Sequence, residues 1–409
     1  MGLYKYRPDP SGSMGVLWTL AMLKNAAILE FGAMGHMIDA RISLEKAGVV
    51  KTAGLYSTHI DDIDVTLGGV ERVTDAIDRI VRNKEVKAVF LLPTAVPEII
   101  GTDFGALVSE IAPRYLEADV IHFGFSGLTT EFNRGVQECL LTLVTKLAKD
   151  ISKDKKRYFN IIGSCADFMR FHGDADELVR IMRGAFGMKP RCVLSSAASI
   201  DDIKDIGAAR MNLVIRKEGV PAAKYLKERF GAPFLEGRPY GVKGTVEWID
   251  RIADMVGIKP DKTFLNGEFL EAERNYEMFE KLHRRSKFYG RTALRISASG
   301  HSDVVKGIAS LADELGLARN RFWCNDPNGG SADIPYLSEQ EWEAILPELE
   351  GDMLMSSGDI LALCGRDQNM LLAHPHRLWS ISIYDAPFMG FRGISGLLTL
   401  WVHEIWKRS

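Results

Sequence analysis

The segment AAILEFGAMGHMIDARISLEKAG, residues 26–48, carries the pattern that decides the fold of this 409-residue chain. Its first part, Ala26 to Phe31, is almost entirely apolar and predicts a buried strand. A turn with two glycines follows, and a helical period begins at His36. In α/β proteins the turn after such a strand lies at the sheet edge where ligands bind. The segment therefore predicts one βα unit and makes His36 a candidate functional residue.

The same strand, turn and helix pattern recurs along the chain. We expect a strand at 87–92 with a helix from about Asp103, and a strand ending at Phe123 with a helix to about Lys149. Further copies follow to the end of the sequence. Strands that are apolar throughout are typical of parallel sheets covered by helices on both faces. The predicted fold class is α/β, with open, mostly parallel sheets flanked by helices.

Two charged stretches divide the repeated units. KDISKDKKR, residues 149–157, follows the first set of units, and a long charged helix is expected over 268–291. We therefore expect three Rossmann-like domains at 1–152, 153–285 and 286–409, the last of them ending in a C-terminal helix.

The composition excludes several classes of function. The chain is 46% hydrophobic and 26% charged with a net charge of −3, and it has no basic stripe for nucleic acid. Its apolar runs are too short to cross a bilayer, so we expect a cytoplasmic protein. The sequence has no GxGxxG fingerprint and no Walker A loop, so no nicotinamide or flavin is indicated.

The cysteines do not form a recognisable framework. They are scattered singly, without a CxxC pair, which argues against disulfides and favours buried hydrophobic positions. The five residues are Cys139, Cys165, Cys192, Cys324 and Cys364.

Several motifs together resemble the component 1 superfamily of nitrogenase, which includes the nitrogenase subunits and the nitrogenase-like reductases. ILEFGAMGH matches a strand that ends in His-Gly-Pro-x-Gly-Cys, and HFGFSGLTTEFNRG matches a Gly-Phe-x-Gly loop. The other similar stretches follow in the family's order: LLPTAVPEIIGTDFGALVSEI, AARMNLVI, APFLEGRPYGVKGTVEWIDRIADMVG and YDAPFMGFRGISGLLTL. The resemblance spans nearly the whole chain and implies three Rossmann-like domains in one subunit.

The resemblance also implies an iron–sulfur cluster at a subunit interface, but the expected cysteines are absent. Their places fall at 9–13, at His36 and at Ala95. Asp9, Ser11 and Ser13 therefore remain as candidate ligands beside His36, because an imidazole can replace a thiolate on iron. The alternative for His36 is a residue that caps the turn or faces a partner subunit.

The cofactor pocket of nitrogenase is altered as well. The cysteine that holds the iron–molybdenum cofactor would fall near Arg216, and the pocket histidine near Ser380. The resemblance therefore implies that the chain is not a nitrogenase α subunit.

Strand-end loops from the three domains are expected to converge on a substrate pocket. Hydroxyl groups and arginines among them would suit an anionic or carboxylated organic ligand. The predicted lining residues are Thr94, Gly124, Ser126, Ser195, Ser196, Arg216 and Arg392.

Two functions follow from the resemblance. In the first, the chain is the cysteine-poor, β-like subunit of a two-component oxidoreductase. It receives electrons from an ATP-dependent iron–sulfur reductase and pairs with a cysteine-bearing sister subunit, or with a second copy of itself, that holds most of the cluster. In the second, it is a non-redox scaffold that binds a ligand or a cofactor precursor on the same fold.

Overall fold

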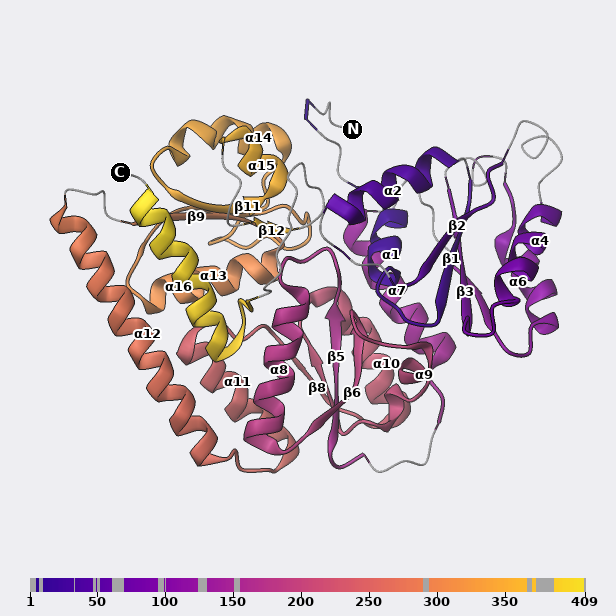
Figure 1. Cartoon of the computed structure of the whole chain (residues 1–409), viewed down its shortest axis with the longest axis horizontal. Helices are drawn as coiled ribbons and strands as arrows, with labels where there is room; N and C mark the ends of the chain where they lie inside the picture. Colours follow the sequence, from indigo (N-terminus) through magenta and orange to yellow (C-terminus); the bar gives the residue numbers. More distant parts are fainter. Residues whose placement is uncertain are drawn as a thin grey trace.

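The computed structural model describes residues 5–6, 10–32, 34–46, 49, 52–60, 70–94, 99, 101–123, 131–150, 155–289, 294–365, 370–372 and 386–407, and all structural statements refer to these. Within them the chain forms three four-stranded sheets in which every strand pair whose direction is defined runs parallel. Helices flank each sheet (Figure 1). The predicted α/β class with open parallel sheets is confirmed.

The first sheet has the strand order β2-β1-β3-β4, and every residue of β1 is buried. Successive side chains of β1 point to opposite faces of the sheet and belong to two separate hydrophobic clusters. Ile28 packs with residues of α1 and α7, and Leu29 packs with residues of α4 and α6. The elements are β1 (Ala26–Phe31), β2 (Gly54–Ser57), β3 (Ala88–Pro93) and β4 (Asp119–His122), with α1 (Gly12–Leu20), α2 (Met34–Lys46), α4 (Val70–Val81), α6 (Phe104–Ile111) and α7 (Phe132–Leu147).

Local chemistry accounts for the helix starts in this sheet. The Asp103 side chain accepts a hydrogen bond from the Ala106 backbone N–H and caps α6 where the sequence predicts its start. The helix α2 begins at Met34, so His36 lies inside its first turn rather than at its start.

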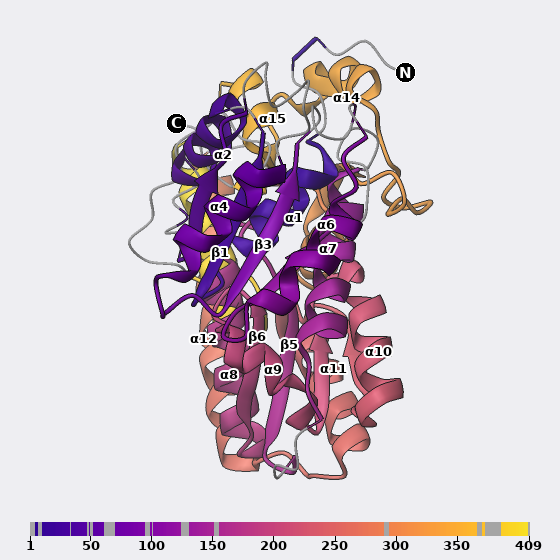
Figure 2. The ribbon, with the colours of Figure 1, turned by 90° about the vertical axis from the view of Figure 1, so that its right-hand side faces the viewer.

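The second sheet has the equivalent order β6-β5-β7-β8. We call each sheet together with the helices given with it a unit, so that the first, second and third units carry β1–β4, β5–β8 and β9–β12. In Figure 2, turned by 90°, the first sheet lies above the second, and α7 packs against α10 of the second unit. The elements are β5 (Tyr158–Ser164), β6 (Lys189–Ser195), β7 (Met211–Val214) and β8 (Phe234–Glu236), with α8 (Phe171–Phe186), α9 (Ile200–Lys204), α10 (Val220–Phe230) and α11 (Gly241–Val256).

The third sheet has the order β10-β9-β11-β12 and follows a long connecting helix. That helix, α12 (Lys262–Phe288), is the charged helix expected from the sequence. The elements are β9 (Arg295–Gly300), β10 (Ala318–Cys324), β11 (Met353–Ser357) and β12 (Met370–Leu372), with α13 (Ser302–Glu314), α14 (Glu339–Ile345), α15 (Gly358–Leu363) and α16 (Gly390–Lys407).

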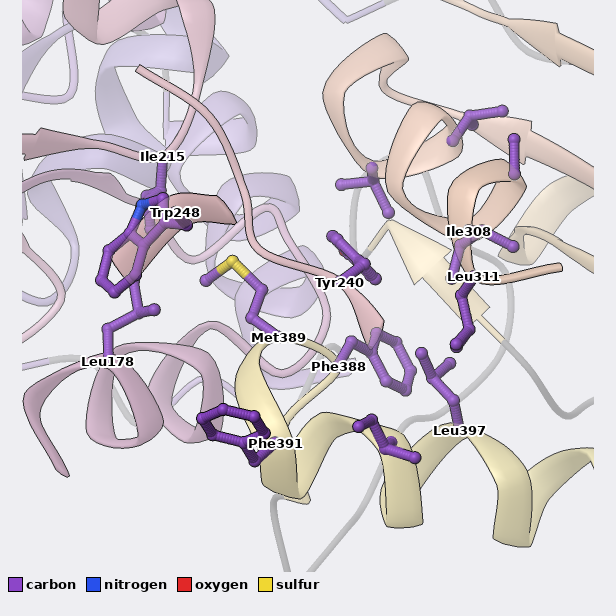
Figure 3. Close-up of a cluster of buried hydrophobic side chains, with 14 of the residues drawn as sticks. Leu178, Ile215, Tyr240, Trp248, Ile308, Leu311, Phe388, Met389, Phe391 and Leu397 are labelled. Carbon is purple, nitrogen blue, oxygen red and sulfur yellow. The ribbon is translucent and has the colours of Figure 1, made fainter. Parts of the chain in front are cut away.

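The second and third sheets share one hydrophobic core, which α16 completes. This helix packs against α8, α11 and α12, all of them helices that precede the third sheet. Figure 3 shows Leu178 and Trp248 of the second unit, Ile308 of the third, and Phe391 and Leu397 of α16 in the same cluster. Burial of this continuous apolar surface fixes the two units to each other.

Two glycines allow α1 and α7 to pack closely against each other. A Cβ on Gly15 would lie 2.2 Å from the Phe132 carbonyl oxygen, and one on Gly135 would lie 2.0 Å from the Gly12 carbonyl oxygen. The backbones of α1 and α7 therefore cross in direct contact, and only glycine fits at the crossing.

We expect Gly135→Ala to lower the free energy of unfolding by about 2 kcal/mol, because the methyl group must push the two helices apart. Gly267→Ala is the matched control, since Gly267 is a helical glycine on α12 with no atom within 4 Å of its added Cβ. That variant should be neutral or up to about 1 kcal/mol more stable through helix propensity. Urea denaturation of both variants measures the difference, and equal stabilities would contradict a close crossing.

Candidate functional site

The turn after β1 is held by threonines from neighbouring strands. The Thr94 hydroxyl donates to the Phe31 carbonyl oxygen over 3.0 Å, and the Gly32 backbone N–H donates to the Thr58 hydroxyl over 3.3 Å. A Cβ on Gly32 would lie 2.2 Å from the Thr94 hydroxyl oxygen, so the close approach requires glycine. The turn presents His36 on the surface in the first turn of α2.

The other residues predicted beside His36 lie at the start of α1. Ser11 precedes the helix and forms an isolated bridge with Glu131, and Ser13 lies in the first turn. Asp9 lies outside the described residues. Within the described chain, His36 belongs to no group of three side chains placed to hold a metal ion.

The helix that carries His36 also has an exposed apolar stripe. Met34, Ile38 and Ile42 are spaced four residues apart on α2 and are 42%, 46% and 42% exposed. Residues at this spacing share one face of a helix. A row of large apolar side chains left in water is typical of a surface that a partner covers.

Sequence reasoning missed a buried carboxyl group beside this turn. Glu30 is the one charged residue in β1, it is 8% exposed, and its Oε2 atom has no hydrogen-bond partner in the described structure. Burial raises the pKa of Glu30 to about 7. The sequence signal was a lone glutamate in an otherwise apolar strand.

A second polar centre lies where the second and third units meet, around Arg216. Its guanidinium group is fully buried and donates from Nη1 to Asp167 Oδ1 over 2.8 Å and from Nε to Glu218 Oε2 over 2.9 Å. The Cζ atom lies 4.3 Å from the ring centroid of Phe168. Burial acts to lower the pKa of Arg216, but Asp167 and Glu218 outweigh it and hold the pKa above its usual value, so the guanidinium stays charged.

His301 extends this network into the third unit. Its Nδ1 accepts a hydrogen bond from the Asp303 backbone N–H at the start of α13, and its Nε2 lies 3.0 Å from Glu218 Oε1. Burial alone would raise the pKa of Glu218, but His301 and Arg216 hold it far below its usual range. The Glu218 carboxylate therefore joins an arginine of one unit to a helix cap of the other.

Lysine and aspartate side chains complete the same junction. The Lys217 ammonium pairs with Asp326, which also accepts from the Ser302 hydroxyl over 2.8 Å, and the Lys217 backbone N–H donates to Asp303. Glu218, His301 and Asp303 are the one group of three potential metal ligands found in the described chain. Both nitrogens of His301 already have partners within the protein, so this group is a structural network.

The described residues among those predicted to line the pocket lie at the second sheet, at the first sheet and on α16. Ser195 and Ser196 are buried at the end of β6, where Ser196 lies 2.6 Å from the Ser164 hydroxyl and Ser195 Oγ lies 3.8 Å from Cys165 Sγ. These serines and Arg216 belong to the second sheet, whereas Thr94 makes its contacts at the first sheet. Gly124 and Ser126 lie outside the described residues.

Arg392 is placed differently from the other predicted pocket residues. Its backbone N–H donates to Glu177, but its side chain is exposed on α16 and takes no part in the buried network. Arg238, which also lies after a strand end, is buried and pairs with Asp174 over 2.5 Å.

Comparison with known proteins identifies the family. The model of nitrogenase component 1 type oxidoreductases matches residues 11–405. The chain belongs to this family. It is 27% identical to the B subunit of light-independent protochlorophyllide reductase from Nostoc punctiforme, over 95% of this chain and 80% of that protein. It is also 27% identical to the iron-molybdenum cofactor biosynthesis protein NifE of Clostridium pasteurianum, over 61% of this chain and 54% of that protein.

Solved structures show the same fold at lower identity. Nitrogenase Cp1 at pH 5 superposes with a TM-score of 0.78 and 16% identity over 100% of this chain and 90% of that one. The resemblance seen in the sequence motifs is therefore confirmed, and this nitrogenase-like chain is an oxidoreductase of the component 1 type. None of the described helices is long and apolar enough to cross a membrane.

Within the part of the chain that the structure describes, the residues of this nitrogenase-like chain do not fit an iron–sulfur cluster of its own. Thiolates are the usual cluster ligands, yet Cys139, Cys165 and Cys192 are buried in the core. Burial raises the pKa of Cys165 to about 11 and holds those of Cys139 and Cys192 well above the usual value, so these thiols stay protonated. His36 has no cysteine beside it in the sequence, and no step through a cluster is assigned to this chain.

We expect Glu30→Gln to change the pH dependence of stability. The folded chain keeps the Glu30 proton up to about pH 7, whereas the unfolded chain releases it near the ordinary pKa of 4.5. The folded state therefore loses stability as the pH rises from about 4.5 to about 7, by about 3 kcal/mol in all. Glutamine cannot ionise, so thermal unfolding at pH 5 and pH 8 should show that the variant gains stability relative to the wild type only at the higher pH.

Glu110→Gln serves as the control for that measurement, since Glu110 is an exposed carboxylate of the same unit. Its stability relative to the wild type should be nearly the same at both pH values. A Glu30→Gln variant that behaves like Glu110→Gln would show that Glu30 ionises normally.

Removal of the guanidinium by Arg216→Met should lower the free energy of unfolding by about 3–5 kcal/mol, because Asp167 and Glu218 are left as buried charges without their cation. Arg284→Met is the matched control, since Arg284 pairs with Glu280 on the exposed face of α12. Arg284→Met should lower the free energy of unfolding by less than about 0.5 kcal/mol. Similar losses in denaturant unfolding of the two variants would contradict the role given to Arg216.

Proposed function

We propose that this chain is the cysteine-poor, β-like subunit of a nitrogenase-like oxidoreductase of two components. It pairs with a cysteine-bearing sister subunit, or with a second copy of itself, and the complex receives electrons from an ATP-dependent iron–sulfur reductase. The observation that carries the proposal is helix α2, which exposes the apolar stripe Met34, Ile38 and Ile42 on one face and His36 on another face of the same helix. This surface supports a partner chain at the position where the family's cluster is expected.

The partner holds most of the iron–sulfur cluster in this proposal. Cys139, Cys165, Cys192 and Cys324 are buried, and His36 is the one residue of this chain proposed as a ligand. An imidazole ligand raises the potential of a cluster relative to a thiolate. The chain would then complete and tune a metal site rather than assemble one.

The substrate pocket is proposed at the strand ends beside Arg216, Ser195 and Ser196. A buried Nη2 atom of Arg216 has no acceptor within the described chain. Ser195 and Ser196 lie at the end of β6, and Arg216 follows β7 in the same sheet, with β5 between the two strands. An N–H without a protein partner is available to a ligand oxygen. These groups support a carboxylated organic substrate, and the relatives named above include a protochlorophyllide reductase.

The test is the iron content of anaerobically purified protein, with and without its genomic neighbours. We expect the chain alone to be colourless, and the complex with a sister chain to be brown and to contain iron. Ile38→Glu should prevent that complex because it places a charge in the apolar stripe. Leu116→Glu, at a position 94% exposed elsewhere in the first unit, should leave it intact.

Two results would overturn the proposal. Iron bound stoichiometrically to the chain alone would contradict a cluster held by the partner. A stable, iron-free assembly of this chain, with no iron in any complex, would favour the non-redox scaffold function instead.

A further inference from the structure

We propose that the cleft between α11 and α13 binds a small oxyanion, a carboxylate or a phosphate. The cleft has a volume of about 320 Å³, and its walls come from the second and the third unit. It is separate from the α2 surface, but Arg216, Arg238 and Asp303 also line it, so it shares Arg216 with the proposed substrate pocket and rests on that part of the proposed function. Binding to the cleft requires neither electron transfer nor a partner subunit. Its volume falls in the range of small-molecule sites, which begins at about 300 Å³.

Helices α11 and α13 and the ends of β7 and β8 form the walls. Gly244 and Trp248 of α11 are one turn apart, and Lys306 lies on the facing helix α13. A Cβ on Gly244 would meet no atom within 4 Å, so this wall is open. On the other side, Tyr240 packs against Gly307, where a Cβ would lie 2.2 Å from the ring, and this contact brings the helices close at the base.

A buried donor in the cleft wall has no acceptor. Trp248 is 4% exposed, and its Nε1 atom makes no hydrogen bond within the described chain. Figure 3 shows the indole nitrogen on the side of Ile215, another residue that lines the cleft. Buried N–H groups in folded proteins nearly always have a partner, so this one calls for a ligand oxygen or a water molecule.

Two cations at the cleft also lack partners. Arg251 of α11 and Lys306 of α13 are exposed, and no carboxylate in the described chain lies within ion-pair distance of either. The helix N-termini are not available to a ligand, because Glu314 caps α11 and His301 caps α13. Recognition therefore depends on side chains, and an oxyanion that reaches both cations would bridge the two units.

The charge of the ligand is limited by carboxylates at the same cleft. Glu236 and Glu247 are exposed lining residues without partners in the described chain, and they repel an extended polyanion. A compact ligand with one or two carboxylate or phosphoryl oxygens pointing to Trp248, Arg251 and Lys306 satisfies the free donors. Nucleic acids and polyphosphates do not fit this distribution of charge.

Isothermal titration of the full chain with inorganic phosphate, and separately with succinate, tests the proposal. We expect saturable binding of at least one of them. The probe with the higher affinity shows whether the cleft prefers a phosphate or a carboxylate. Lys306→Gln and Arg251→Gln should each weaken binding about tenfold, the size of one charge-assisted hydrogen bond. Trp248→Phe should weaken it as well, since phenylalanine keeps an apolar ring and removes the donor.

Lys224→Gln is the matched control, because Lys224 is an exposed lysine on α10 that does not line the cleft. Lys224→Gln should bind phosphate and succinate with the affinity of the wild type. The proposal is overturned if neither probe binds saturably, or if both Lys306→Gln and Arg251→Gln bind with unchanged affinity. These two variants alter exposed side chains, so the test remains decisive even if Trp248→Phe folds poorly.

Discussion

The pairing of a fully buried guanidinium with two carboxylates is the interaction on which the arrangement of the second and third units depends. Arg216 comes from the end of β7, and its partner Glu218 also contacts His301 at the end of β9. A buried charge is stable only when every partner is in place, so the network permits one relative position of the two sheets. The shared hydrophobic core supplies the driving force for the contact, and the network supplies its specificity.

This constraint also bears on the position near which the sequence resemblance places a cofactor cysteine. The resemblance places a cofactor cysteine of nitrogenase near Arg216, and here an arginine with its own carboxylate partners takes that place. A side chain that is held by protein groups on two sides is poorly suited to bind a metal.

The sequence predicted the regular part of this structure well. The strand at Ala26–Phe31, the Asp103 cap and the charged helix α12 follow from short-range patterns, because apolar runs, caps and charge periodicity act locally. The sites were harder to predict. Arg216 was expected to line a pocket, but its pairing with Asp167, 49 residues away, depends on which strand ends meet, and no local pattern encodes that. Glu30 was visible as a lone charge in an apolar strand, yet its raised pKa arises from burial in the folded chain, which the local sequence does not show.

The position of α16 has a consequence for how the protein is made. Phe388, Phe391 and Leu397 fill the core beside Leu178 and Trp248, and the whole third sheet lies between them in the sequence. A ribosome therefore releases the second sheet long before the side chains that complete its core have been synthesised. During that interval the apolar surfaces of α8 and α11 that α16 later covers are exposed, and exposed surfaces of this kind make an incomplete chain prone to aggregation.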